Sequence, residues 1–355
     1  MVEGSGLGRP SHPDRFRPVE MEEPGRPTAD PWNPLLDAGP RLGALVRVVL
    51  CGMGTVGTEV LKHLVERGHT VAGVIDADPA KAGKTVAELT GFPVGVRVHQ
   101  SVQSAPLADA DVAVFAAGSR VEDVAGDIAH LLSAGLDVVT TAEEMVYPSH
   151  AAGDEAGKLD AIAKEKVVTL VGVGANPGFV MDWVPAVVAS ASKNPTRIHV
   201  VRSVDVSHRR QQLHKRVGVG LSRAKFEKER AEGKIGQIGL VESAHLVALS
   251  LGWKLEGASE GTFPVLGSED YVMGVRQFAE GKAGDCVIRL DLEMTTTSAD
   301  FDVIEVTGDP VIKIRFEKGV FGDSATVAMA VHAVERIGKA RAGLITVLDL
   351  PLSGL

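Results

Sequence analysis

The stretch VRVVLCGMGTVG (residues 46–57) decides the fold. Its first half is mostly apolar and β-branched, which is typical of a buried strand, and the following TEVLKHLVERG carries apolar residues at helical spacing. The GxGxxG pattern between them allows a tight turn at its first glycine, close approach of a ligand at its second and helix packing at its third. A strand, a glycine turn and a helix in this order predict a dinucleotide site, with the pyrophosphate at the helix N-terminus.

A second strand, TVAGVID, supports this interpretation because it ends in Asp76, where a carboxylate can bind the ribose hydroxyls of NAD. Lys81 and Lys84 would instead meet the 2'-phosphate of NADP if Asp76 turned away, or they are solvated helix charges. The sequence therefore leaves NAD and NADP open. The predicted cofactor-binding residues are Gly52, Met53, Gly54, Thr55, Val56, Gly57, Asp76, Lys81, Ala116, Ala117 and Thr141.

Composition restricts the class of protein. The chain has 355 residues, 45% of them hydrophobic, and a net charge of -9, which argues against a general binder of nucleic acid or of anionic membranes. Its two cysteines argue against a disulfide scaffold and suit a reducing cytoplasm. The first residues lack an apolar signal-peptide core, and no run of about 18 apolar residues free of charge or proline occurs, so we expect neither secretion nor a membrane span.

Three segments follow from the pattern of apolar residues. Residues 1–42 are rich in Gly, Pro and charged residues, which predicts a flexible or surface-laid extension. Residues 43–175 alternate single strands and helices, which predicts a Rossmann domain that residues 324–355 complete. Residues 176–323 contain successive period-two runs, which predict a substrate and dimerisation domain. The predicted fold class is thus α/β, a Rossmann domain followed by an α+β domain with a mainly antiparallel sheet.

Three local expectations can be checked directly. A helix should begin at Pro79 and run through residue 90, and RIHVVRSVDVSHRR (residues 197–210) should be one long strand. The breakers in GVGANPGFVMD (residues 172–182) predict a turn whose backbone N–H groups near Gly178 face a polar ligand, or else an ordinary strand-to-helix turn.

The fifth strand leads into Glu143 and Glu144, at the edge where ligands of doubly wound sheets bind. Thr141 and Glu144 also spell a capping box, in which Glu144 reaches back to the backbone of Thr141 and leaves Glu143 the freer carboxylate. Capping or surface roles for both glutamates are the alternative. The basic run SHRRQQLHKR (residues 207–216) could clamp a substrate carboxylate, form interdomain salt bridges or simply be solvated.

Six segments occur in this order along the chain: GMGTVG, VVTTAEEMVYP, GANPGFVMD, VDVSHRRQQLHKRVGVG, GQIGLVESAHLVALSLGWKL and GLITVLDLP. Together they resemble the 2,4-diaminopentanoate dehydrogenases and the related native amine dehydrogenases, and the layout is more distantly similar to dihydrodipicolinate reductase. The likeness runs from about Leu42 to the C-terminus. It departs at Ala342, where the family tends to have proline, and at VHAVERI, where a more apolar run with an asparagine is usual.

The resemblance implies NAD(P)-dependent oxidative deamination of an amine to a ketone or aldehyde, or the reverse reductive amination with ammonia. It implies that Glu143 or Glu144 is the catalytic carboxylate. A carboxylate suits the reaction because it can take a proton from ammonia and favours a cationic iminium. The residues implied to contact the substrate are Asn176, Pro177, Phe179, His208 and Arg209.

Other functions fit parts of the same pattern. The chain could be a 2,4-diaminopentanoate dehydrogenase proper, an imine or semialdehyde reductase of the same layout, or a cofactor-binding sensor without turnover. The reductase would require a catalytic lysine or histidine pair in place of Glu143 and Glu144, and the sensor would need no general base. No metal is expected, because His208, His214 and His245 lack the spacing of a zinc site. Analogy with two-domain dehydrogenases predicts a homodimer.

Overall fold

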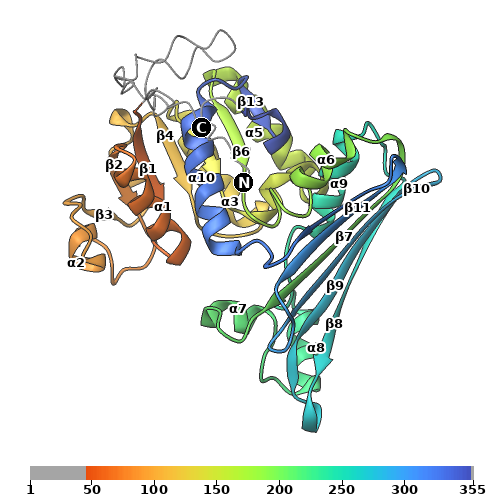
Figure 1. The fold of residues 1–355 in the computed structure, drawn as a ribbon. Helices are drawn as coiled ribbons and strands as arrows, with labels where there is room; N and C mark the ends of the chain where they lie inside the picture. Colours follow the sequence, from red (N-terminus) through yellow and green to blue (C-terminus); the bar gives the residue numbers. More distant parts are fainter. Residues whose placement is uncertain (1–44, 353–355) are drawn as a thin grey trace, which may run out of the picture. The chain divides into compact units, whose positions relative to one another are not determined.

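A parallel sheet forms the first layer of the computed structural model, which describes residues 45–352; the predicted extension over residues 1–42 lies outside that range. The strands of this sheet are β1 (Arg47–Cys51), β2 (Thr70–Ile75), β3 (Val98–His99), β4 (Val112–Phe115), β5 (Asp137–Thr140), β6 (Thr169–Gly172) and β13 (Gly343–Ile345). They lie in the order β13-β6-β5-β4-β1-β2-β3, all parallel (Figure 1). This is the order of a Rossmann sheet, extended by β13 at one edge.

Helices cover both faces of this sheet. They are α1 (Thr55–Glu66), α3 (Val121–Ser133), α5 (Gly153–Lys166) and α10 (Gly322–Ile337). Successive residues of β1 point to opposite faces, so Leu50 joins the core beneath α1 and α10 while Cys51 joins the core beneath α3 and α5. Both faces of the strand are therefore buried, which is why its sequence reads as a continuous apolar run.

A second, mixed sheet carries the other hydrophobic core. Its strands are β7 (Lys193–Asp205), β8 (Gly257–Leu266), β9 (Val272–Ala283), β10 (Cys286–Thr295), β11 (Phe301–Asp309) and β12 (Ile312–Phe316). They lie in the order β12-β11-β7-β10-β9-β8, and every neighbouring pair is antiparallel except β7 with β10. Helices α6 (Trp183–Ala189), α8 (Arg223–Ala231) and α9 (Leu240–Ser250) contribute apolar residues to this core. The predicted α/β fold class, with a mainly antiparallel second sheet, is confirmed.

Short elements connect these layers. They are α2 (Val86–Thr90), α4 (Pro148–Ala151), α7 (Gln211–Arg216) and the 3-10 turns η2 (Val102–Ser104), η3 (Leu107–Asp109), η4 (Glu143–Val146), η5 (Ser268–Asp270) and η6 (Val347–Asp349). Helix α10 runs back along the parallel sheet and packs on α1, as its sequence predicts (Figure 1).

Two of the local predictions are wrong about where an element begins or ends. The helix expected from Pro79 begins only at Val86, because Thr85 and Glu88 form a capping box that starts it there. The long strand expected through residue 210 ends at Asp205, whose side chain accepts a hydrogen bond from the backbone N–H of Ser207 at 2.8 Å and so turns the chain. In both cases a short polar side chain binds nearby backbone, which competes with the regular element.

Contact between α1 and the glycine turn gives the first testable prediction. A Cβ on Gly57 would lie 1.9 Å from the carbonyl oxygen of Gly52, whereas a Cβ on Gly54 would have no heavy atom within 4 Å. Because backbone cannot move aside cheaply, Gly57→Ala should lower the free energy of unfolding by about 3 kcal/mol. Gly54→Ala, the matched control, should cost about 1 kcal/mol or less. Denaturant unfolding measures both, and equal losses would contradict the packing argument.

Candidate functional site

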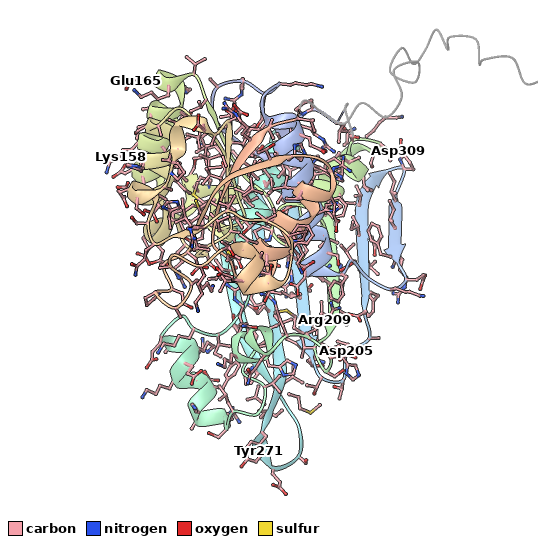
Figure 2. All side chains as sticks on the ribbon, turned by 90° about the vertical axis from the view of Figure 1, so that its left-hand side faces the viewer. Lys158, Glu165, Asp205, Arg209, Tyr271 and Asp309 are labelled. Carbon is pink, nitrogen blue, oxygen red and sulfur yellow. The ribbon has the colours of Figure 1, made fainter. Side chains whose placement is uncertain are left out.

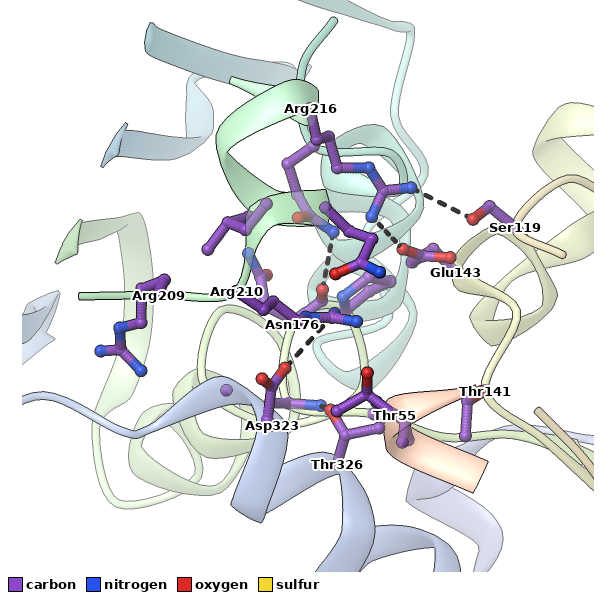
Figure 3. Close-up of a pocket in the computed structure, with 18 of the residues that line it drawn as sticks. Thr55, Ser119, Thr141, Glu143, Asn176, Arg209, Arg210, Arg216, Asp323 and Thr326 are labelled. Carbon is purple, nitrogen blue, oxygen red and sulfur yellow. Dashed lines mark hydrogen bonds and ion pairs between the residues drawn. The ribbon is translucent and has the colours of Figure 1, made fainter. Parts of the chain in front are cut away.

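A cavity of about 360 Å³ lies at the carboxyl ends of β1, β4, β5 and β6 (Figure 3). The parallel sheet supplies one side of its wall, and the second sheet with α7 supplies the other. This is the crevice where doubly wound sheets bind ligands. The lining residues include Gly54, Thr55, Val56, Ala116, Ser119, Thr141, Glu143, Asn176, Pro177, Arg202, Arg209, Arg210, Arg216, Gln237, Asp323 and Thr326.

The glycine turn forms one end of the cavity. Gly52 has a φ of +97°, and its N–H donates to the carbonyl of Ile75 at 2.7 Å, so a residue with a side chain would be strained there. Gly54 has no side chain to cap α1, and the first turn of α1 contains no acidic residue. The N–H groups and the positive end of the helix dipole therefore suit an anion. The other residues expected in the cofactor set do not line the cavity itself: Gly52, Met53, Gly57, Asp76, Lys81 and Ala117.

Asp76 and Lys81 contact each other. The Nζ of Lys81 lies 2.7 Å from Oδ2 of Asp76, which also accepts the N–H of Met53 at 2.8 Å. Burial opposes ionisation of Asp76, but hydrogen bonds from Lys81, Asp78 and Met53 outweigh it and hold the pKa of Asp76 below its ordinary value. Asp76 is thus an anion at the end of β2, while Lys84 is exposed.

Glu143 is the carboxylate that faces the cavity. It begins η4 directly after β5, and its side chain is 17% exposed. The Nη1 of Arg216 donates to Oε1 of Glu143 at 2.6 Å, and Nη2 of the same guanidinium donates to Oγ of Ser119 at 3.1 Å (Figure 3). Glu143 therefore has one oxygen engaged by a cation from the far wall.

Glu144 turns away from the cavity. Its Oε2 accepts the N–H of Val121 at 2.8 Å, and its Oε1 lies 3.3 Å from Nη1 of Arg120. The predicted capping box with Thr141 is wrong, because Glu144 instead binds the start of α3, where an N–H group and the helix dipole both favour a carboxylate.

A buried carboxylate organises the turn between β6 and α6. Asp182 accepts the N–H of Gly178 at 2.7 Å and the hydroxyl of Ser243 at 2.7 Å, and burial raises its pKa. The expectation that the N–H of Gly178 faces a ligand is therefore wrong. Asn176, by contrast, lines the cavity, and its Oδ1 is buried without a hydrogen-bond partner among the described residues.

Of three further residues expected to contact the substrate, one lines the cavity and two do not. Arg209 lines the cavity beside Asp205 (Figure 2), but its Nη2 is paired with Asp300 at 3.1 Å. His208 is exposed and Phe179 stacks on Trp183 with ring centroids 5.7 Å apart; neither lines the cavity. The basic run of residues 207–216 was a signal for this wall, although its spacing did not single out Arg216.

Within residues 45–352 no group of three His, Cys, Asp or Glu side chains could hold a metal ion. No helix in that range is both long and apolar enough to cross a membrane.

Glu242, a residue of α9, is only 6% exposed. Burial, with a smaller contribution from the charges of Glu144 and Glu260, raises the pKa of Glu242 to about 7, although a backbone hydrogen bond and the charge of Arg120 oppose the shift. The folded protein therefore holds a proton on Glu242 between about pH 4.5 and pH 7, where the unfolded chain has released it. Stability is lost as the pH rises through this window.

Glu242→Gln should remove the loss of folding stability that ionisation of Glu242 causes at higher pH. At about pH 8 the variant should gain on the order of 2 kcal/mol in free energy of unfolding, and at about pH 4, below both pKa values, it should gain nothing. The exposed Glu165→Gln is the control and should change neither value. Denaturant unfolding at the two pH values measures the effect, and a loss of stability at the higher pH would contradict it.

Comparison with known proteins identifies the relatives of this chain. Residues 179–354 match the model of the 2,4-diaminopentanoate dehydrogenase C-terminal domain. The chain is 25% identical over 333 residues to 2,4-diaminopentanoate dehydrogenase of Acetoanaerobium sticklandii, covering 86% of this chain and 94% of that protein.

Solved structures agree at the level of the fold. The structure of amine dehydrogenase from Mycobacterium smegmatis is similar with a TM-score of 0.78 and 21% identity, covering 86% of this chain and 96% of that one. The structure of GenD2 from gentamicin A biosynthesis, in complex with NAD, has a TM-score of 0.52 and 16% identity, covering 77% and 73%. The resemblance found in the sequence is confirmed: residues 179–354 match the 2,4-diaminopentanoate dehydrogenase C-terminal domain, and the chain is an oxidoreductase similar to the amine and diaminopentanoate dehydrogenases.

Proposed function

We propose that this protein is an NAD(P)-dependent amine dehydrogenase that interconverts an amine and a ketone or aldehyde, with ammonia as co-substrate and Glu143 as catalytic base. The observation that carries the proposal is the position of the Glu143 carboxylate, in the same cavity as the glycine turn. Deamination and amination both need a group that takes a proton from nitrogen and tolerates a neighbouring cation, and a carboxylate does both.

A nicotinamide dinucleotide fits the residues present. Its pyrophosphate would lie against Gly54, Thr55 and Val56 at the N-terminus of α1, and Asp76 would receive the ribose. When bound, the nicotinamide ring supplies or accepts the hydride. The GenD2 complex with NAD supports a nicotinamide cofactor in this kind of fold. Because Lys81 neutralises Asp76 at 2.7 Å, we propose that both NAD and NADP are accepted.

The chain's own residues would do the proton chemistry. Glu143 would take a proton from ammonia or from the amine, and its negative charge would favour the iminium that accepts the hydride. The unpartnered Oδ1 of Asn176 offers a second acceptor in the cavity, which an N–H of the amine could satisfy. Two acceptors suit an amine better than an alcohol, because a protonated amine carries up to three N–H donors.

The experiment that tests this proposal compares Glu143→Gln with Glu144→Gln. Oxidation of NADH or NADPH, added separately, is followed with a panel of ketones and aldehydes, with and without ammonia. We expect ammonia-dependent oxidation that falls about 1,000-fold in Glu143→Gln, because removal of a general base costs 100-fold to 10,000-fold. Glu144→Gln, which changes the neighbouring carboxylate outside the cavity, should retain most activity.

Other outcomes would replace the proposal. Oxidation that does not depend on ammonia would indicate an imine or carbonyl reductase. Activity confined to diamino acids would identify a 2,4-diaminopentanoate dehydrogenase proper, which the family match favours as the second candidate. Cofactor binding without turnover across the panel would indicate a sensor.

We also propose that residues 43–175, completed by residues 324–355, form the cofactor domain, and that residues 176–323 form the substrate domain and mediate a homodimer. One face of β10 is buried, whereas Arg289, Asp291 and Glu293 on the alternate face stay partly exposed and present both signs of charge. A face of mixed charge can match a copy of itself across a two-fold axis. Sedimentation should give twice the chain mass of 37.2 kDa, and a stable monomer would contradict the dimer.

A further inference from the structure

Arg216 reaches Glu143 from the opposite wall of the cavity. It is the last residue of α7, and its guanidinium contacts Glu143 at 2.6 Å and Ser119 at 3.1 Å (Figure 3). These partners follow β5 and β4 of the parallel sheet and lie 73 and 97 positions away in the chain. One side chain therefore joins α7 to the loop that carries the proposed base.

The other arginines of this wall are engaged elsewhere. Within the described structure Arg216 alone among them pairs with Glu143. The remaining pairs are Arg202 with Asp302 at 2.7 Å, Arg209 with Asp300 at 3.1 Å and Arg210 with Asp323 at 3.3 Å. The cations of the cavity wall are thus largely neutralised by carboxylates of the chain itself, which leaves Arg216 as the group that acts directly on Glu143.

The backbone holds Arg216 in place. Its carbonyl accepts the N–H of Gly236 at 2.8 Å, and the next residue, Val217, is completely buried in the second core. Gly218 follows with a φ of +71° and packs on Phe226. The backbone of Arg216 is thus fixed on both sides, which limits the positions that its guanidinium can reach.

We propose that Arg216 is the positioning residue of Glu143. It binds Oε1 and fixes the carboxylate at the cavity wall, so that Oε2 is presented to the amine nitrogen. This role rests on the proposed function, in which Glu143 is the base. It differs from a substrate clamp, because the guanidinium acts on the enzyme's own carboxylate rather than on an anionic group of the substrate.

The test uses Arg216→Met and Arg216→Lys, with Arg120→Met as the matched control because Arg120 pairs with Glu144 outside the cavity. Arg216→Met should lower kcat for reductive amination about 100-fold, as expected when a catalytic group loses its orientation. The KM for the carbonyl substrate and the Kd of the cofactor should stay within about twofold, since these contacts are made elsewhere. Arg216→Lys should recover about tenfold, because it restores the charge without the planar fork.

Three readouts separate this role from a structural one. Arg120→Met should change kcat less than about threefold, because Arg120 does not line the cavity. Arg216→Ala should regain activity with added guanidinium, which a folding defect would not allow. If Arg216→Met has lost its structure, as judged by its thermal unfolding, the lysine variant and the guanidinium rescue decide alone.

Two results would overturn the proposal. An unchanged kcat combined with a raised KM, seen only for substrates that carry a carboxylate, would make Arg216 a substrate clamp. Full activity in Arg216→Met would remove any role in positioning. Glu143→Gln is assayed in parallel, so a failure of the proposed base shows as activity in that variant, whatever the arginine variants do.

Discussion

The close approach of α1 to β1 is the contact on which the cavity depends. Gly57 lies so close to the carbonyl oxygen of Gly52 that no side chain fits at this position. This contact fixes where α1 begins, and therefore where its unpaired N–H groups point. Because β4 lies next to β1 and β5 lies next to β4 in the parallel sheet, the ends of β4 and β5 fall on the same side of this helix N-terminus. The anion site at the N-terminus of α1 and the carboxylate of Glu143 therefore lie in the same cavity.

A second constraint joins the two sheets at the far end of the cavity. Asp182 is fully buried, yet it accepts hydrogen bonds from Gly178, from Trp183 and from the hydroxyl of Ser243 on α9. Burial of a carboxylate is costly unless donors surround it, and here they do. The turn that carries Asn176 is consequently tied to α9 and, through α9, to the core of the second sheet.

Much of this arrangement could be predicted from the sequence, because it depends on local patterns. The glycine fingerprint and the alternation of apolar runs were sufficient for the parallel sheet, and period-two runs were sufficient for most of the second sheet. The sequence could not predict which polar side chains pair with each other when they are distant in the chain. Arg216 lies 73 positions after Glu143 in the chain, and no spacing rule relates the two positions. The pairing of Lys81 with Asp76 shows the same limit at short range, since it depends on how the chain turns after β2.

The two adjacent glutamates illustrate that limit most clearly. In sequence Glu143 and Glu144 are equivalent acids after a strand, and a capping rule was the only means of separating them. In the structure they begin a 3-10 turn, in which consecutive side chains point about 120° apart. One side chain therefore enters the cavity toward Arg216, while its neighbour meets the start of α3 and Arg120. Each carboxylate has its own cation, so the difference between them lies in direction and surroundings rather than in the residue type, and it follows from the geometry of a single turn.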